Sequence, residues 1–125
     1  MKYILITFLF IISFRANALE LTLSQGTVKP TPIAITDLYS LDSSLVKLGE
    51  NISSVVSDNL ERSGLFNSID KKAFIQTNQS LSNQPRFEDW KVLKAQHLFA
   101  GKIELNGNKI SIEFRLFDVF AQKQI

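Results

Sequence analysis

The chain has 125 residues, with 14 lysines and arginines, 12 aspartates and glutamates, one histidine and no cysteine. This length suits one domain, and without disulfides the fold must rest on apolar packing. Residues 1–18 contain two basic and no acidic side chains, so residues 19–125 carry 12 of each sign, and scattered, balanced charge argues against nucleic-acid binding.

The first 18 residues have the order of a secretory signal peptide. One lysine precedes the apolar run Tyr3–Phe14, and Ala16 and Ala18 form the small-residue pattern of a cleavage site. The run has 12 residues, whereas a membrane-spanning helix needs about 20. We therefore expect cleavage before Leu19 and a mature protein outside the cytoplasm that does not span the membrane. An uncleaved anchor is the alternative.

An extended segment is predicted over residues 19–31. Apolar and polar side chains alternate at its start, which is the period of a strand with one apolar face. The residues are Leu19, Glu20, Leu21, Thr22, Leu23 and Ser24, followed by Gln25 and Gly26. Pro30 and Pro32 cannot donate to a sheet ladder, so this strand is predicted to be partly detached. Its free backbone groups can add to a partner's sheet edge or pair within its own domain.

The main domain is expected over residues 32–125, beginning with a short buried strand at Pro32–Ile35. A loop over residues 36–49 leads to an amphipathic helix at Glu50–Ser63, and Gly64 is placed to end it. The predicted apolar side comprises Ile52, Val55, Val56 and Leu60, and the predicted polar side includes Ser53, Ser54 and Ser57. Leu65, Phe66 and Ile69 continue as a short apolar stretch into a turn.

A second, short helix is predicted to open at Pro85 and to end near Ala95. Phe87, Trp90 and Leu93 lie near one side of it. The helical neighbours of Trp90 favour a place in the core. An exposed Phe87–Trp90 surface would instead offer aromatic faces for stacking on a sugar.

The strongest local pattern is a C-terminal β-hairpin. Strand-like runs at Leu98–Leu105 and Lys109–Phe120 flank Asn106-Gly107, a dipeptide typical of two-residue turns. A turn centred on this dipeptide sets Phe99 opposite Phe114. Moving the centre by one residue changes the pairing by two and buries the same faces, so the register stays open. The Leu116-Phe117 pair breaks the alternation, which indicates a bulge or a doubly buried stretch.

These elements predict an α+β fold, a small mixed sheet with two helices packed on one face and a C-terminal β-hairpin. The chain stops directly after its last predicted strand, which indicates an edge strand or a fragment.

The sequence contains no pattern suited to catalysis, and we expect neither a cofactor nor a metal. His97 is the only histidine, so a metal site would depend on carboxylates. Glu88 and Asp89 fall in the first turn of the second helix, where acidic side chains favour the helix dipole. The chain has no nucleophile elbow, phosphate loop or dinucleotide fingerprint. We therefore expect a protein that is not an enzyme.

Several segments together resemble the amino-terminal domain of TolB, the periplasmic component of the Tol-Pal cell-envelope system. They are Pro32–Ile35, Ile52–Phe66, Trp90–Leu93 with Phe99–Ile103, and Phe114–Val119, in the family's order and spacing. Lys94 stands where the family usually turns with glycine. Thr36-Asp37 replaces a common Pro-Phe pair.

The resemblance implies a periplasmic adaptor that supports outer-membrane integrity, cell division and protein transport. It assigns contact with the inner-membrane protein TolA to the segment Leu19–Gly26. In the family a β-propeller follows and binds the lipoprotein Pal, so Pal binding is not expected of residues 19–125. The alternatives are a truncated product without function and a periplasmic protein that binds small ligands or glycans.

Overall fold

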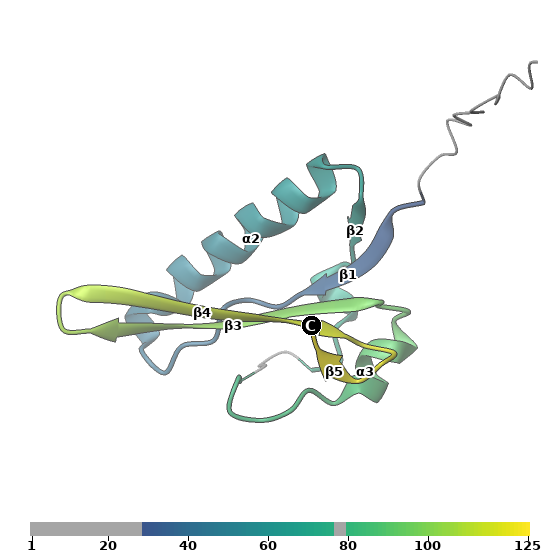
Figure 1. Ribbon diagram of the computed structural model, residues 1–125. Helices are drawn as coiled ribbons and strands as arrows, with labels where there is room; N and C mark the ends of the chain where they lie inside the picture. The colour runs from purple at the N-terminus through teal and green to yellow at the C-terminus, as the bar shows by residue number, and fades with distance from the viewer. Residues whose placement is uncertain (1–28, 77–79) are drawn as a thin grey trace, which may run out of the picture.

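The computed structural model describes residues 29–76 and 80–125, so the predicted signal peptide lies outside the described residues. The elements are β1 (Thr31–Ile35), the 3-10 turn η1 (Ser43–Leu45), α2 (Val46–Arg62), β2 (Phe66–Ser68), the 3-10 turn η2 (Lys71–Ala73), α3 (Phe87–Val92), β3 (His97–Asn106), β4 (Lys109–Asp118) and β5 (Lys123–Gln124). The strands form one mixed sheet in the order β2-β1-β3-β4-β5 (Figure 1). The predicted α+β class is confirmed.

β1 is an inner strand that runs parallel to both of its neighbours, β2 and β3. Ile33 and Ile35 point to one side of the sheet and Ala34 to the other, and all three are buried. The strand predicted at Pro32–Ile35 is confirmed, but it is an inner strand, whereas the prolines predicted an exposed or edge position for this stretch. The Pro32 carbonyl accepts from the Gln96 amide at 2.9 Å, which places Pro32 level with the residues just before β3. Because β3 begins only at His97, the N–H that proline lacks removes no hydrogen bond from the pairing of β1 with β3.

The two helices lie on opposite faces of the sheet, so the prediction that both pack on one face is wrong (Figure 1). Residues 33–35 of β1 and 98–100 of β3 are apolar on both sides, and a strand buried on both faces needs a cover on each. The α2 side contains Ile33, Ile35, Leu38, Leu45, Phe99 and Ile103. The α3 side contains Ala34, Leu81, Phe87, Trp90, Ala95, Leu98, Ala100, Phe117 and Val119.

α2 begins at Val46, four residues before the predicted start, and follows directly from η1. Asp42 caps η1, because its Oδ1 accepts from the Ser44 amide at 2.9 Å. Gly49 is buried within the helix, and a Cβ there would lie 2.7 Å from the Leu38 carbonyl oxygen. The sequence placed Gly49 in the loop just before the helix. In the structure its lack of a side chain lets α2 contact that loop closely.

The polar and apolar sides of α2 differ from the prediction at two positions. Ser53 is completely buried, whereas Val55 is 57% exposed. The Ser53 Oγ accepts from the Leu38 amide and donates to the Gly49 carbonyl, both at 3.0 Å. These two bonds satisfy the buried Ser53 hydroxyl, although serine as a residue type is expected to face solvent. At the other end, Gly64 has φ +75° and ends the helix as predicted.

β2 and the hairpin complete the sheet. β2 was expected only as a short apolar stretch, and it pairs through Thr31↔Phe66 with β1. The hairpin is confirmed, with the turn centred on Gly107 and Asn108. Phe99 therefore faces Leu116 rather than Phe114. Pairing of β3 with β4 is continuous, so the broken alternation at residues 116–117 marks a stretch covered on both faces, not a bulge.

Candidate functional site

The side chains that could carry chemistry are separated from one another or already paired. His97 begins β3 opposite Asp118, and its buried Nδ1 has no hydrogen-bond partner within the described ranges. Glu88 accepts from Lys91 Nζ at 3.0 Å, and Asp89 lies 2.9 Å from an Arg86 nitrogen. Residues 29–76 and 80–125 contain no cluster of three metal-ligating side chains.

The aromatic pair considered for sugar stacking is part of the core. Trp90 has no exposed surface, and Phe87 is also buried. Trp90 meets Phe74 edge to face at a centroid distance of 5.0 Å, and Phe87 meets Phe117 at 6.0 Å. Neither ring presents a face to solvent, so a glycan platform at these residues is contradicted and the predicted core placement is confirmed.

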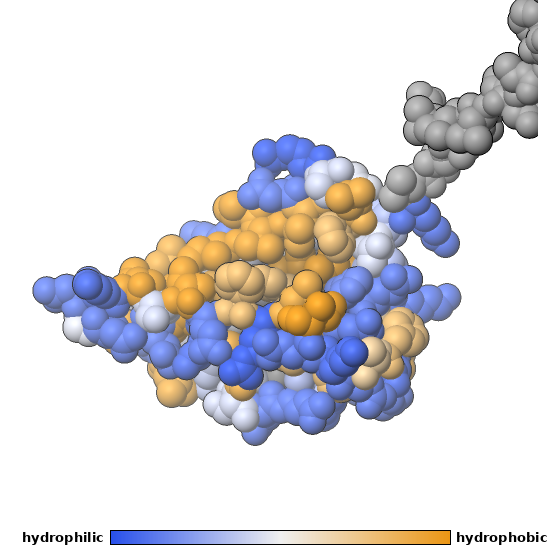
Figure 2. Space-filling view, in the orientation of Figure 1, coloured by the Kyte–Doolittle hydropathy of each residue, from blue (hydrophilic) through white to orange (hydrophobic). Residues whose placement is uncertain are grey.

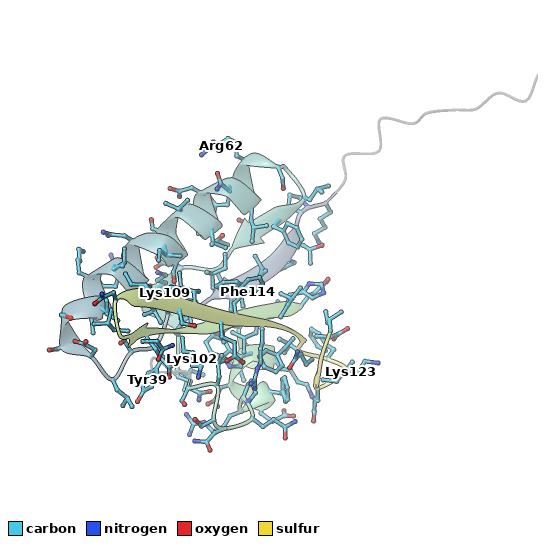
Figure 3. The ribbon with its side chains drawn as sticks, turned by 60° about the vertical axis from the view of Figure 1, so that its left-hand side comes forward. Tyr39, Arg62, Lys102, Lys109, Phe114 and Lys123 are labelled. Atoms are coloured by element: carbon cyan, nitrogen blue, oxygen red, sulfur yellow. The ribbon has the colours of Figure 1, made fainter. Side chains whose placement is uncertain are left out.

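A pocket of about 370 Å³ lies beside the half of the hairpin that is nearer its turn. Tyr39 and Lys102 line it from the β1–α2 loop and β3 (Figure 3). Lys102 Nζ lies 3.2 Å from Glu104 and 3.6 Å from Glu113. Hydrogen bonds from Ser44 lower the pKa of Asp42, which is used in capping. The charged side chains of this pocket therefore bind one another or the backbone.

An apolar groove of about 430 Å³ lies between α2 and β4. Figure 2 shows it as a continuous hydrophobic band across the α2 side of the molecule. Phe114 is 64% exposed at its border and stacks on Phe99 with a centroid distance of 5.5 Å. The side chains that line this apolar groove come from α2, β4 and the strands beneath: Ile33, Leu38, Ile52, Val56, Leu60, Phe66, Phe99, Ile112, Phe114 and Leu116.

Sequence reasoning missed this groove because it treated the apolar face of β4 as buried along its length. The alternation of Ile110, Ile112 and Phe114 identifies a face, but only the position of α2 decides whether that face is covered. α2 packs over β1 and β3 and leaves these three residues about half exposed.

The segment predicted to recognise a partner lies outside the described residues, as does the predicted cleavage site at Ala16 and Ala18. The segment comprises Leu19, Glu20, Leu21, Thr22, Leu23, Ser24, Gln25 and Gly26. The chain enters the described part through Lys29 and Pro30, which are exposed. The Thr31 amide then donates to the Leu65 carbonyl at 2.9 Å.

The family model of the TolB amino-terminal domain matches residues 19–125. The chain belongs to the TolB amino-terminal domain family. Two relatives named Tol-Pal system protein TolB support the TolB assignment. The protein from Pelagibacter ubique is 41% identical across the whole chain, and that from Paramagnetospirillum magneticum is 47% identical across 82% of it. The chain spans only 30% and 23% of these TolB proteins.

The crystal structure of TolB from Acinetobacter baumannii has the same fold over 76% of this chain and 21% of that protein. The TM-score is 0.55 at 24% identity. No helix of the TolB-like domain, within its described residues, is long and apolar enough to cross a membrane.

Proposed function

We propose that the chain is a non-enzymatic periplasmic adaptor of the Tol-Pal system. In this proposal, Leu19–Gly26 binds a TolA-like inner-membrane protein by adding a strand to its sheet. The observation that carries the proposal is the family match, which includes this segment as well as the folded domain. Export through the signal peptide would release Leu19 as the free end. Binding of Pal is left out, because the family resemblance assigns it to the propeller.

The physical support comes from the pattern of the segment and from the domain behind it. In the proposed strand, Leu19, Leu21 and Leu23 would share one apolar side, and Pro30 has no N–H to donate to a sheet ladder. In strand addition the backbone supplies hydrogen bonds, while alternate side chains enter the partner's pockets. The paired charges and buried aromatic rings of the described domain leave recognition, rather than catalysis, as the function best supported.

The decisive experiment compares two triple variants of the exported chain. Replacing Leu19, Leu21 and Leu23 with serine should weaken binding to the TolA-like domain by at least about tenfold, because the apolar side that enters the partner is lost. The matched control replaces Glu20, Thr22 and Ser24 with alanine and should keep most of the affinity. Isothermal titration calorimetry gives both affinities, and a thermal melt of each variant should match that of the parent.

Equal binding by the leucine variant and the parent would refute the assigned role of the segment. A chain without a cooperative thermal transition would favour the alternative of a truncated, non-functional product. The proposed roles in outer-membrane integrity and division are tested in cells. Loss of the chain's coding sequence should increase detergent sensitivity and delay constriction, and expression of the intact chain should reverse both.

A further inference from the structure

The way in which the amino-terminal segment joins the sheet carries a further inference. The segment proposed to bind a TolA-like protein leads through Lys29 and Pro30 into β1, the inner strand between β2 and β3. In the proposed function, on which this inference rests for the source of tension, that partner is held in the inner membrane. Movement of the domain away from the membrane would therefore stretch the linker and pull on the first residues of β1.

Backbone hydrogen bonds hold β1 on both sides at its first two residues. The Thr31 amide donates to the Leu65 carbonyl, just before β2, at 2.9 Å. The Pro32 carbonyl accepts from the Gln96 amide, just before β3, also at 2.9 Å. A pull on the start of β1 is therefore opposed from both sides at the point where it enters the sheet.

Hydrogen bonds to β3 continue beyond the end of β1. The amide and the hydroxyl of Thr36 both donate to the Phe99 carbonyl, at 3.0 and 3.1 Å. The Tyr39 amide donates to the Gly101 carbonyl at 2.8 Å, and the Tyr39 carbonyl accepts from the Ile103 amide at 2.9 Å. The chain therefore stays attached to β3 from the start of β1 as far as Tyr39.

The side chains of β1 also oppose sliding of the strand. Ile33 and Ile35 are buried in the α2-side cluster, and Ala34 is buried in the α3-side cluster. Burial of apolar surface is favourable, so moving β1 out of the sheet costs free energy on both faces. Backbone bonds and side-chain packing thus act on the same short strand.

β1 runs parallel to both of its neighbours, so a pull on its start is directed along all three strands. Sliding β1 out requires the hydrogen bonds on both sides to break together, whereas a pull across the sheet breaks them one after another from one end. We propose that β1 is a load-bearing strand, which keeps the domain folded while the amino-terminal segment is under tension. The load enters the sheet as shear between β1 and its two parallel neighbours.

Two exposed positions allow a pull on Lys29 along the strands or across them. The hairpin turn, which contains Asn108, lies beyond the end of β1 in the direction that β1 runs (Figure 1). The β4–β5 turn, which contains Ala121, lies level with the start of β1, because Ile33 pairs with His97 and His97 pairs with the last residue of β4. Lys29, Asn108 and Ala121 are all exposed, so each can carry an attachment without disturbing the core.

Single-molecule force spectroscopy of the exported chain tests the proposal. The sequence has no cysteine, so pairs of introduced cysteines define where the force acts. Lys29→Cys with Asn108→Cys loads β1 along the strands, and Lys29→Cys with Ala121→Cys is the matched control across the sheet. At one loading rate the first pair should unfold at a force at least about twofold higher, because several hydrogen bonds must break together. Both double variants should keep the thermal melt of the parent.

Thr36→Val, added to each pair, tests whether β1 is the strand that resists. It removes the buried hydroxyl bond to the Phe99 carbonyl and keeps the branched shape of the side chain. The unfolding force along the strands should fall. The force across the sheet should stay nearly unchanged, because that bond lies at the end of β1 that opens last.

Equal unfolding forces in the two directions would overturn the proposal. An early step at low force, in which β1 leaves the sheet while the rest stays folded, would also overturn it, as would an equal effect of Thr36→Val in both directions. The measurement contains no partner and is therefore separate from the test of the proposed function. Failure of a TolA-like protein to bind would remove the source of the tension, whereas the difference between the two directions would remain.

Discussion

Lys94 has a left-handed backbone conformation, with φ of 59°, directly after α3. Its amide donates to the Lys91 carbonyl at 2.8 Å, and the next amide, of Ala95, returns to Trp90 at 3.2 Å. The turn therefore has the geometry of a helix C-terminal cap that usually contains glycine. Lys94 therefore occupies a backbone conformation that glycine favours.

Replacing Lys94 with glycine should stabilise the protein by about 0.5–1 kcal/mol. The strain of a Cβ in the left-handed region is relieved, and the greater freedom of glycine in the unfolded chain offsets part of the gain. Urea unfolding followed by circular dichroism measures the change. Lys94→Ala is the matched control and should bring little gain because it retains the Cβ. Equal stabilisation by both variants would assign the effect to the lost charge.

At the scale of elements, the contact between α2 and the loop after β1 depends on two small residues, Gly49 and Ser53. Gly49 lets the Leu38 backbone approach the helix, and Ser53 satisfies the Leu38 amide there. A larger or non-polar residue at either position disturbs a close backbone contact. α2 is therefore positioned by a polar bond within an otherwise apolar interface.

Ser53→Ala should lower the free energy of unfolding by about 1–3 kcal/mol, because the Leu38 amide would be left buried without its partner. Ser54→Ala on the exposed side of the same helix is the matched control. It should be neutral or slightly stabilising, since alanine has the higher helix propensity. Chemical denaturation of both variants gives the comparison. A Ser53 variant as stable as the Ser54 variant would show that the bond contributes nothing.

The elements differ in how far sequence could predict them. The hairpin could be predicted because the alternating pattern and the glycine turn are local features of the sequence. Its register could not be predicted, because the pattern is the same in neighbouring registers. β2 was missed because its three residues form a strand only by pairing with β1, about 35 residues earlier. The start of α2 was misplaced because Gly49 is a boundary signal in sequence and a packing residue in the fold.

At the scale of the whole molecule, a single sheet separates two apolar clusters. The α+β class followed from the order of elements, but the arrangement of helices did not. Both faces of β1 and β3 are apolar, and only the fold shows that α2 and α3 divide them. The apolar groove could not be predicted for the same reason, because its exposure depends on how much of the β4 surface α2 covers.

Because the clusters share β1 and β3, they should unfold together. Trp90 is the only tryptophan and lies on the α3 side, so its fluorescence reports on that cluster. Leu60→Ala on the α2 side should shift the fluorescence midpoint and the far-ultraviolet circular dichroism midpoint equally, with a loss of about 1–3 kcal/mol. A shift confined to circular dichroism would mean that the two faces unfold independently. Val55→Ala, at an exposed position on α2, is the control and should move neither midpoint appreciably.

The central place of β1 has a consequence for the order of folding. Its partners arrive later along the chain, since Ile33 pairs with Ser68 on one side and His97 on the other. At a synthesis rate of roughly 5–20 residues per second, the second partner emerges about 3–13 s after β1. Both edges of this apolar strand are open until β2 emerges, and the edge that pairs with β3 stays open until the end of that interval. Among the strands that the structure describes, the first to emerge is therefore the one most dependent on a chaperone's protection.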